Sequence, residues 1–168
     1  MADEYYDAIA DGYDELYGEE QERKLKLIKT RLKINSKTKI LDIGCGTGIS
    51  TNFNCFCIGI DPSENLISIA KKKNYSVKHK YIVDCAENIE KMGFKQDEFD
   101  YVLCISAVHH INYLDKFLKI ISRISREQVF TVLNKISKKE KIINTIKEHL
   151  NIKSIIEEEK DVVLFCGK

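Results

Sequence analysis

The feature that most limits how this 168-residue chain can fold is the stretch Ile40–Thr51, ILDIGCGTGIST. An apolar run ends at Asp42, and glycine then stands at positions 44, 46 and 48. Glycine adopts positive φ readily and has no Cβ to obstruct a ligand. In open parallel sheets, ligands bind beyond the carboxyl ends of the strands, commonly at the turn after the first strand. We therefore expect a strand here that leads into a ligand-binding turn.

Apolar, β-branched runs alternate along the chain with segments whose apolar residues recur every three or four positions. The predicted strands are Lys39–Ile43, Cys57–Ile60, Lys80–Val83, Phe99–Ile105 and Gln128–Leu133. The predicted helices are Glu20–Leu32, Ser63–Lys73, Tyr113–Ser125 and Lys138–Leu150. Such alternation predicts an α/β fold with a doubly wound, mostly parallel sheet and helices on both of its faces.

The end of the chain breaks this rhythm. Lys153–Glu158 and Val162–Cys166 read as two short strands with a few polar residues between them, which predicts an antiparallel hairpin at the sheet edge. The length suits one domain over residues 1–168, with a helical cover over 1–33 and the sheet core over 38–168. The connection from Gly48 to Asp61 leaves room for little more than a helical turn or two.

Composition narrows the possible partners and location. The net charge of +1 gives no overall attraction to nucleic acid or to anionic membranes, although the first 22 residues hold nine acids and residues 23–39 are strongly basic. No apolar run approaches the ~18 residues of a membrane span, and no leader opens the chain, so we expect a cytoplasmic protein. The six cysteines fit buried, reduced thiols, and their spacing predicts no metal site.

The glycine spacing separates the classes of nucleotide site. A dinucleotide fingerprint, G-x-G-x-x-G, would need glycine where Ile49 stands, and a P-loop would need a Lys-Ser/Thr pair after the glycines. The pattern is instead G-x-G-x-G, with Asp42 two residues ahead of it. The amides of the turn and of a following helix start favour an anionic group. A pyrophosphate ligand is not expected.

Five segments in order resemble the motifs of class I S-adenosylmethionine-dependent methyltransferases. These are YYDAIADGYDELY at 5–17, LDIGCGTG at 41–48, GIDPS at 59–63, VDCAENI at 83–89 and FDYVLCISAVHHI at 99–111. The first is similar to the N-terminal helix of many small-molecule and RNA methyltransferases, and the others to successive strand ends of the core. The resemblance implies a Rossmann-like seven-stranded fold, S-adenosyl-L-methionine as cofactor, S-adenosylhomocysteine as product, and methyl transfer.

The resemblance also implies roles for individual residues. The turn would approach the methionyl part of the cofactor, an acid before it would hold the amino end, a second acid would accept the ribose hydroxyls, and a third would bind adenine. The turn consists of Gly44, Cys45, Gly46, Thr47 and Gly48, and the acid before it is Asp42. The acid for the ribose is Asp61, beside Pro62. The acid for adenine is Asp84, with Cys85 and Ala86 lining the base. An alternative for Asp61 is a helix N-cap, which Ser63 could fill instead.

Two tyrosines could cover the sulfonium. Tyr6 and Tyr13 are seven residues apart and would share one face of the N-terminal helix. An aromatic face attracts a cation, so the pair could close over the charged sulfur. Core packing explains one of the two equally well.

Two histidines follow the predicted fourth strand, where the acceptor should bind. Imidazole titrates near neutrality, so His109 or His110 could act as a base. Alternatively, one packs structurally and the other faces solvent. The same strand runs into Ile105-Ser106-Ala107-Val108 and lacks the Asn/Asp-Pro-Pro-Tyr signature of amide-methylating branches, so methylation of glutamine or of adenine N6 is not expected.

The acceptor remains open among three hypotheses. A small molecule is favoured, and no membrane partner is expected. A histidine pair in this block also resembles methyltransferases that modify wobble uridines of tRNA, sometimes with a small activating subunit, but the sequence shows no concentrated Arg/aromatic surface. The third hypothesis is a cofactor-binding subunit that does not catalyse and instead stabilises a partner protein.

Overall fold

The computed structural model describes residues 2–73 and 76–168, with side chains from Tyr5 onward. Its contacts divide the chain into two compact units, Met1–Cys85 and Ala86–Lys168. The seven strands follow the order β3-β2-β1-β4-β5-β7-β6, and the predicted seven-stranded, mostly parallel α/β sheet is confirmed. Within the described residues, no helix combines the length and the apolar character that a membrane crossing requires. The prediction of a single domain stays a prediction.

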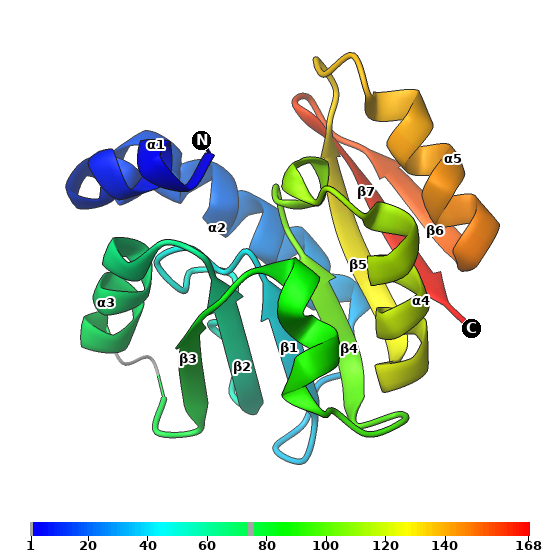
Figure 1. Ribbon diagram of the computed structural model, residues 1–168, viewed down its shortest axis with the longest axis horizontal. Coiled ribbons are helices and arrows are strands. Elements are labelled where there is room, and N and C mark those ends of the chain that lie inside the picture. Colours follow the sequence, from blue (N-terminus) through cyan, green and yellow to red (C-terminus); the bar gives the residue numbers. More distant parts are fainter. Residues whose placement is uncertain (1, 74–75) are drawn as a thin grey trace. The chain divides into compact units, whose positions relative to one another are not determined.

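The first unit is built on three parallel strands that lie side by side in Figure 1. The strands are β1 (Lys39–Ile43), β2 (Phe56–Asp61) and β3 (His79–Val83). Its helices are α1 (Ala2–Ala8), the 3-10 turn η1 (Ala10–Gly12), α2 (Tyr13–Arg31) and α3 (Glu64–Lys73). Because the strands are parallel, their carboxyl ends meet at one edge of the sheet, where Ile43 pairs with Ile60 and Asp61 with Val83.

The second unit contains the end of the chain. Its strands are β4 (Phe99–Cys104), β5 (Ser125–Leu133), β6 (Asn151–Glu157) and β7 (Asp161–Gly167). Its helices are η2 (Ala86–Met92), η3 (Val108–His110), α4 (Leu114–Ile124) and α5 (Lys139–His149). β4 and β5 are parallel, whereas β7 pairs antiparallel with both β5 and β6. The predicted C-terminal antiparallel hairpin is therefore confirmed.

The N-terminal helix departs from the prediction, because it is interrupted between Tyr6 and Tyr13. α1 ends at Ala8, η1 follows, and α2 begins at Tyr13. Gly12 at the junction has φ −101° and ψ 3°, and its N–H bonds to the carbonyl of Ile9, three residues back. Glycine is a poor helix former, which favours an interruption at this position. The two tyrosines therefore belong to different helices, and the premise of one continuous helix face is wrong.

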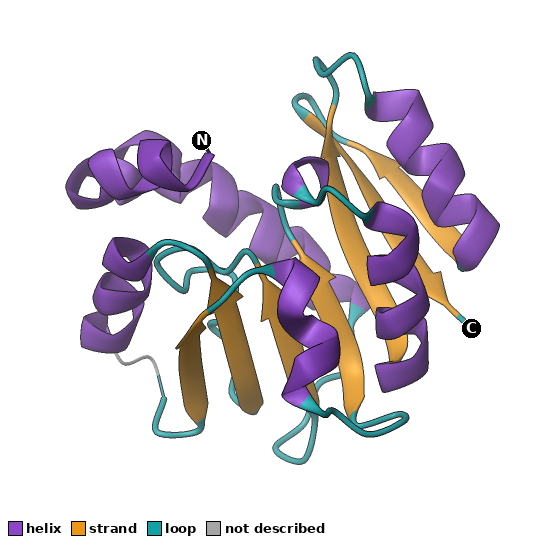
Figure 2. Cartoon of the chain, in the orientation of Figure 1, coloured by secondary structure: helices purple, strands orange, loops and turns teal. Residues whose placement is uncertain are grey.

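The connection from β1 to β2 also differs from expectation. Residues 44–55 form turns and bends, drawn as loop in Figure 2, in place of a helical turn. Three backbone hydrogen bonds there join residues three apart: Gly48 to Cys45, Thr51 to Gly48, and Asn52 to Ile49. The connection is close to the minimum length for a parallel crossover, so it has no residues to spare for a helix. The helix start expected after the glycines is absent from this segment.

Candidate functional site

The turn after β1 has the backbone conformation that its glycines allow. The φ angles are +74° at Gly44, +53° at Gly46 and +83° at Gly48, values that residues with a Cβ rarely adopt. The N–H of Gly44 donates to the carbonyl of Ile60 at 2.8 Å, which fixes the turn to β2. A Cβ on Gly48 would also lie 2.8 Å from the Tyr81 hydroxyl. Glycine at position 48 is therefore required by both conformation and space.

Asp61, the last residue of β2, joins the glycine turn to α3. Its Oδ2 accepts a hydrogen bond from the Gly46 N–H at 2.8 Å, and its Oδ1 accepts one from the Ser63 N–H at 2.9 Å. The Ser63 hydroxyl accepts the N–H of Leu66 at 3.1 Å, which is the bond an N-cap makes. Ser63 thus caps α3, and Asp61 positions the turn. The role predicted for Asp61 toward the ribose hydroxyls stays a prediction.

Asp42 is buried beneath the turn. The Ser50 hydroxyl donates to its Oδ2 at 2.5 Å, whereas its Oδ1 has no hydrogen-bond partner within residues 2–73 and 76–168. Burial raises the pKa of Asp42 to about 7, the Ser50 hydrogen bond opposes this rise, and the negative charge of Asp61 adds to it. A buried acceptor without a donor is costly. A cationic donor such as an amino group would satisfy it.

Tyr13 lies against the glycine turn. Its hydroxyl is 3.4 Å from the position where a Cβ on Gly46 would stand. The Tyr6 and Tyr13 rings meet edge to face with centroids 6.1 Å apart, so the two tyrosines are in contact although they belong to different helices. Burial raises the pKa of the Tyr13 phenol well above its usual range, and the neighbouring Tyr6 and Asp61 contribute. Tyr13 is a neutral, half-buried aromatic group beside the turn.

Two aspartates that sequence reasoning did not single out fasten the N-terminal helices to this turn and to α3. Asp14 accepts the Thr47 hydroxyl at 2.6 Å and forms an ion pair with Lys73. Asp7 accepts the hydroxyl of Ser63 and, at 3.3 Å, the N–H of Asn65. Both aspartates stand in the motif at 5–17 and in the acid-rich first 22 residues, but neither pattern pointed to these contacts.

The predicted adenine-binding segment begins at the end of β3. The Asp84 N–H donates to the carbonyl of Asp61 at 3.1 Å, and its Oδ1 accepts the N–H of Cys85 at 2.8 Å. Asp84 and Cys85 are half-buried in the first unit, while Ala86 opens η2 of the second unit. Asp42, Asp61 and Asp84 therefore stand at or near the carboxyl ends of three adjacent strands.

The histidine pair lies in the second unit, on η3. The His109 and His110 ring centroids are 4.1 Å apart, with His109 half-buried and His110 exposed. Ahead of them, Ser106 has φ +56°, a left-handed conformation uncommon for a residue with a Cβ. Its N–H donates to the Thr131 hydroxyl at 2.7 Å, which holds the chain in this bend after β4. No sequence signal pointed to this feature, because serine is not a typical left-handed residue.

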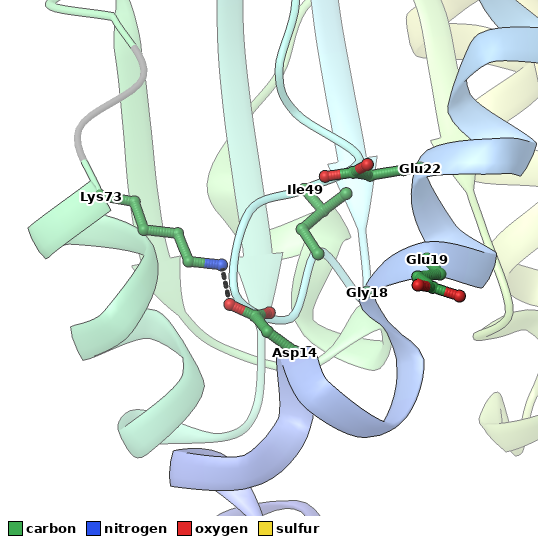
Figure 3. A pocket seen from close by; sticks show the side chains of 6 residues that line it. All are labelled: Asp14, Gly18, Glu19, Glu22, Ile49 and Lys73. Atoms are coloured by element: carbon green, nitrogen blue, oxygen red, sulfur yellow. Dashed lines mark ion pairs between the residues drawn. The ribbon is translucent and has the colours of Figure 1, made fainter.

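A cavity of about 450 Å³ lies beside the turn, between α2 and the end of α3 (Figure 3). Its lining consists of Asp14, Gly18, Glu19, Glu22, Ile49 and Lys73, and the Lys73 side chain points toward Asp14. None of the residues predicted to bind the cofactor lines it. This acidic cavity is separate from the predicted cofactor site and was not anticipated from the sequence.

The first unit fits S-adenosylmethionine on two observations. The turn has three positive-φ glycines. Because glycine has no Cβ, a ligand can approach the backbone of the turn closely. The Oδ1 of Asp42, which has no hydrogen-bond partner in the described part of the chain, suits the ammonium group of the methionyl part. The individual residue roles remain predictions.

Comparison with known proteins identifies the family. Residues 34–163 match the sequence model of a family described as a methyltransferase domain. A protein of uncharacterised function from Methanocaldococcus jannaschii is 33% identical over 135 residues, which cover 78% of this chain and 51% of that protein. The ubiquinone biosynthesis O-methyltransferase of Pelagibacter ubique is 32% identical over 93 residues, covering 53% and 38%. The chain spans about half the length of the curated relatives it matches, or less.

Solved structures show the same fold. A methyltransferase from Haloferax volcanii, solved in complex with the Trm112 methyltransferase activator, superposes with a TM-score of 0.80 at 14% identity and 96% coverage of both chains. An S-adenosylmethionine-dependent methyltransferase from Thermotoga maritima superposes with a TM-score of 0.73 at 17% identity and 100% coverage of both. The chain belongs to the class I S-adenosylmethionine-dependent methyltransferase family, whose cofactor is S-adenosylmethionine.

Proposed function

We propose that this protein transfers a methyl group from S-adenosylmethionine to a small-molecule acceptor. The observation that carries the proposal is the positive-φ glycine turn flanked by Asp42 and Asp61 at the ends of β1 and β2. This arrangement replaces a dinucleotide fingerprint, and it agrees with the family to which the chain belongs. Both the acceptor and the reaction are proposals, since the matches cover only 51% and 56% of the length of two of the relatives.

Each cofactor residue is proposed for one contact. The turn would approach the methionyl part, Asp42 its ammonium group, and Asp61 the ribose hydroxyls, with Asp84, Cys85 and Ala86 around adenine and Tyr13 near the sulfonium. The cofactor supplies an electrophilic methyl group on its sulfonium, so the chemistry resides in the cofactor. The protein holds the reactants in a near-attack arrangement, an effect worth roughly 7–11 kcal/mol of the barrier in well-oriented systems.

The acidic N-terminal helices favour a small acceptor over a polyanion. Asp14 contacts Thr47 of the glycine turn, so the acid-rich segment borders the proposed cofactor site. Like charges repel at short range, which disfavours the approach of a phosphate backbone to this edge. The O-methyltransferase among the relatives supports a small acceptor, since its name assigns that protein to ubiquinone biosynthesis.

The second candidate is a tRNA methyltransferase of the wobble-uridine type that requires an activating subunit. The similarity to the Haloferax volcanii methyltransferase supports it, because that protein was solved with the Trm112 activator and the two chains superpose over 96% of their lengths. The third candidate is a cofactor-binding subunit without catalysis.

His109 or His110 could act as a general base in either catalytic candidate. A base would be needed only for an acceptor that must lose a proton.

An acceptor screen with methyl-labelled S-adenosylmethionine tests the proposal. We expect label transfer into a metabolite extract and none into purified tRNA, with transfer lost in Asp61→Ala. Label in tRNA that appears only when an activator is added would favour the second candidate. Binding of S-adenosylhomocysteine by calorimetry without transfer to either extract would favour the third and overturn catalysis by this chain.

A further inference from the structure

The outer edge of β3 is unlike the other sheet edge. β3 ends the strand order and pairs with β2 alone among the described residues. The carbonyl of Lys78 and the N–H of Asp84 both bond toward β2. Because alternate residues of a parallel strand direct their backbone groups to opposite sides, Tyr81 and Val83 direct theirs outward. Such a row of backbone donors and acceptors is a template for a further strand.

The same edge exposes apolar side chains. Ile82 is 37% exposed and Val83 is 45% exposed, and Val77, just ahead of the strand, is 93% exposed. All three are β-branched residues that favour strands and pack well against a neighbouring strand. Successive strand residues point to opposite faces, so Ile82 and Val83 offer apolar contact on both faces of the edge.

The opposite edge, β6, carries features that discourage strand addition. Its pairing with β7 is shifted between Ile152 and Ser154 by a bulge. Lys153 on β6 forms an ion pair with Glu127 at 2.9 Å, and Glu157 is also exposed. Bulges and charged side chains are the devices that protect an edge. The register of β3 with β2 is regular over all five pairs, so β3 has no bulge of this kind.

The charge around β3 selects among possible occupants. Residues 65–83 contain five lysines and no acid. Lys71 and Lys72 at the end of α3 and Lys78 and Lys80 at β3 are exposed, while Lys73 is paired with Asp14. A second copy of this chain would bring the same positive charges to the contact, which is unfavourable. An acidic partner would complement them.

We propose that the outer edge of β3 docks an acidic protein partner, which adds a strand to the sheet beside Tyr81 and Val83. Backbone hydrogen bonds along the edge would supply affinity, and the alternating side chains would supply specificity. The partner strand would place apolar residues beside Tyr81 and Val83 on one face, and acids near Lys78 and Lys80 on the other face, which Ile82 shares. The inference deepens the partner part of the proposed function and does not depend on which molecule accepts the methyl group.

Two peptides test the proposal: a blocked nine-residue strand that alternates glutamate and valine, and its counterpart that alternates lysine and valine. Binding to the full chain would be followed by amide chemical shifts. We expect the acidic peptide to bind and to shift the amides of Tyr81 and Val83. The lysine peptide should bind at least about tenfold more weakly, and added salt should narrow the gap.

Three substitutions locate the site. Ile82→Glu and Lys80→Glu should each weaken acidic-peptide binding about tenfold or more, and Lys80→Glu should improve binding of the lysine peptide. Ile155→Glu on β6, where Ile155 is 48% exposed, is the matched control and should leave binding unchanged. Thermal melting and S-adenosylhomocysteine binding verify that each variant is folded, and Ile82→Thr replaces Ile82→Glu if that variant does not fold.

Several results would overturn the proposal. These are failure of the acidic peptide to bind, equal binding of both peptides, and amide shifts centred on β6. Self-association of the wild type that Ile82→Glu abolishes would assign the edge to a second copy instead. Peptide binding by a wild type that fails to bind S-adenosylhomocysteine would overturn the proposed methyl transfer and leave the docking edge standing.

Discussion

At the residue scale, Asp42 links burial to pH. Its pKa is raised by burial from 3.8 to about 7 in the folded state, so ionisation is harder in the fold than in the unfolded chain. The stabilising contribution is fully present below pH 3.8 and is lost as the pH rises through 7. The Asp42→Asn side chain cannot ionise. We therefore expect the free energy of unfolding of this variant to exceed that of wild type by roughly 1–4 kcal/mol at pH 8, and by less at pH 5. Urea denaturation at both pH values measures the difference.

The pH dependence of S-adenosylhomocysteine binding provides a second test of the ionisation of Asp42. If Asp42 holds the ammonium group of the cofactor, wild-type affinity for S-adenosylhomocysteine should rise as the pH passes through 7, and Asp42→Asn should lose this dependence. An Asp42→Asn variant that is less stable than wild type at pH 8 would mean that the carboxylate is already satisfied when ionised.

Asp61 has a structural role, and we propose a ligand role for it as well. Asp61→Ala should weaken S-adenosylhomocysteine binding by about 1.5–3 kcal/mol, since it removes a charged acceptor for the ribose. It should also lower stability, because the N–H groups of Gly46 and Ser63 lose their acceptor. Ser63→Ala is the matched control: it removes the cap of α3 at a cost of about 0.5–2 kcal/mol but retains the carboxylate. Calorimetry that finds equal affinity losses in both variants would assign Asp61 a structural role alone.

At this scale, the sequence predicted which acids and glycines gather at the turn but not how they bond. Asp42, Asp61 and the glycines stand at motif positions that the chain order makes visible. The bond from Gly46 to Asp61 joins residues 15 apart, and that from Thr47 to Asp14 joins residues 33 apart. The first pairing depends on how the turn folds back onto β2 and the second on how α2 packs against the turn, and no local pattern encodes either.

At the element scale, the absence of a Cβ at Gly48 and at Gly59 makes room for the Tyr81 side chain of β3. A Cβ on Gly59 would lie 2.8 Å from the Cys45 sulfur and 2.9 Å from Tyr81 Cδ1. Gly59→Ala should therefore destabilise the fold by about 1–3 kcal/mol, as overpacking does. Gly12→Ala is the control, because nothing lies within 4 Å of its added Cβ and its φ is negative. Thermal denaturation should leave Gly12→Ala unchanged or slightly more stable, and equal losses in both variants would contradict the packing argument.

Element type was predictable, whereas element ends were not. The apolar runs at β1, β2 and β4 are almost entirely buried, which is why their patterns were clear. β5 begins at Ser125, ahead of the predicted Gln128, because the polar residues Ser125 and Glu127 pair with β4 and Glu127 also pairs with β7. The break between α1 and α2 was missed since the apolar spacing continues across Gly12.

For the molecule as a whole, the predicted site residues divide between the two units. Every predicted cofactor residue except Ala86 lies in Met1–Cys85, whereas His109 and His110 lie in Ala86–Lys168. The motif order predicted both groups, but the division into units comes from long-range contacts. The residues proposed to bind the cofactor therefore lie mainly in the first unit, and the two histidines proposed as bases lie in the second.

The last prediction concerns the N-terminal cover and its control of turnover. Asp7 and Asp14 tie α1 and α2 to Ser63, Thr47 and Lys73 through hydrogen bonds and an ion pair. Terminal segments are ordered only as far as such contacts hold them. We expect residues 2–17 to exchange amide hydrogens readily without ligand and to become protected when S-adenosylhomocysteine binds, because closure excludes water from the methyl group.

Asp14→Ala tests this cover, because it removes the contacts to both Thr47 and Lys73. Exchange over residues 2–17 should rise in the variant without ligand, and turnover should fall more than cofactor affinity. Glu15→Ala is the neighbouring control, since Glu15 is an exposed acid and should leave exchange unchanged. Strong and equal protection of these amides with and without S-adenosylhomocysteine would mean that the cover is fixed structure, and the loss of turnover would then need another cause.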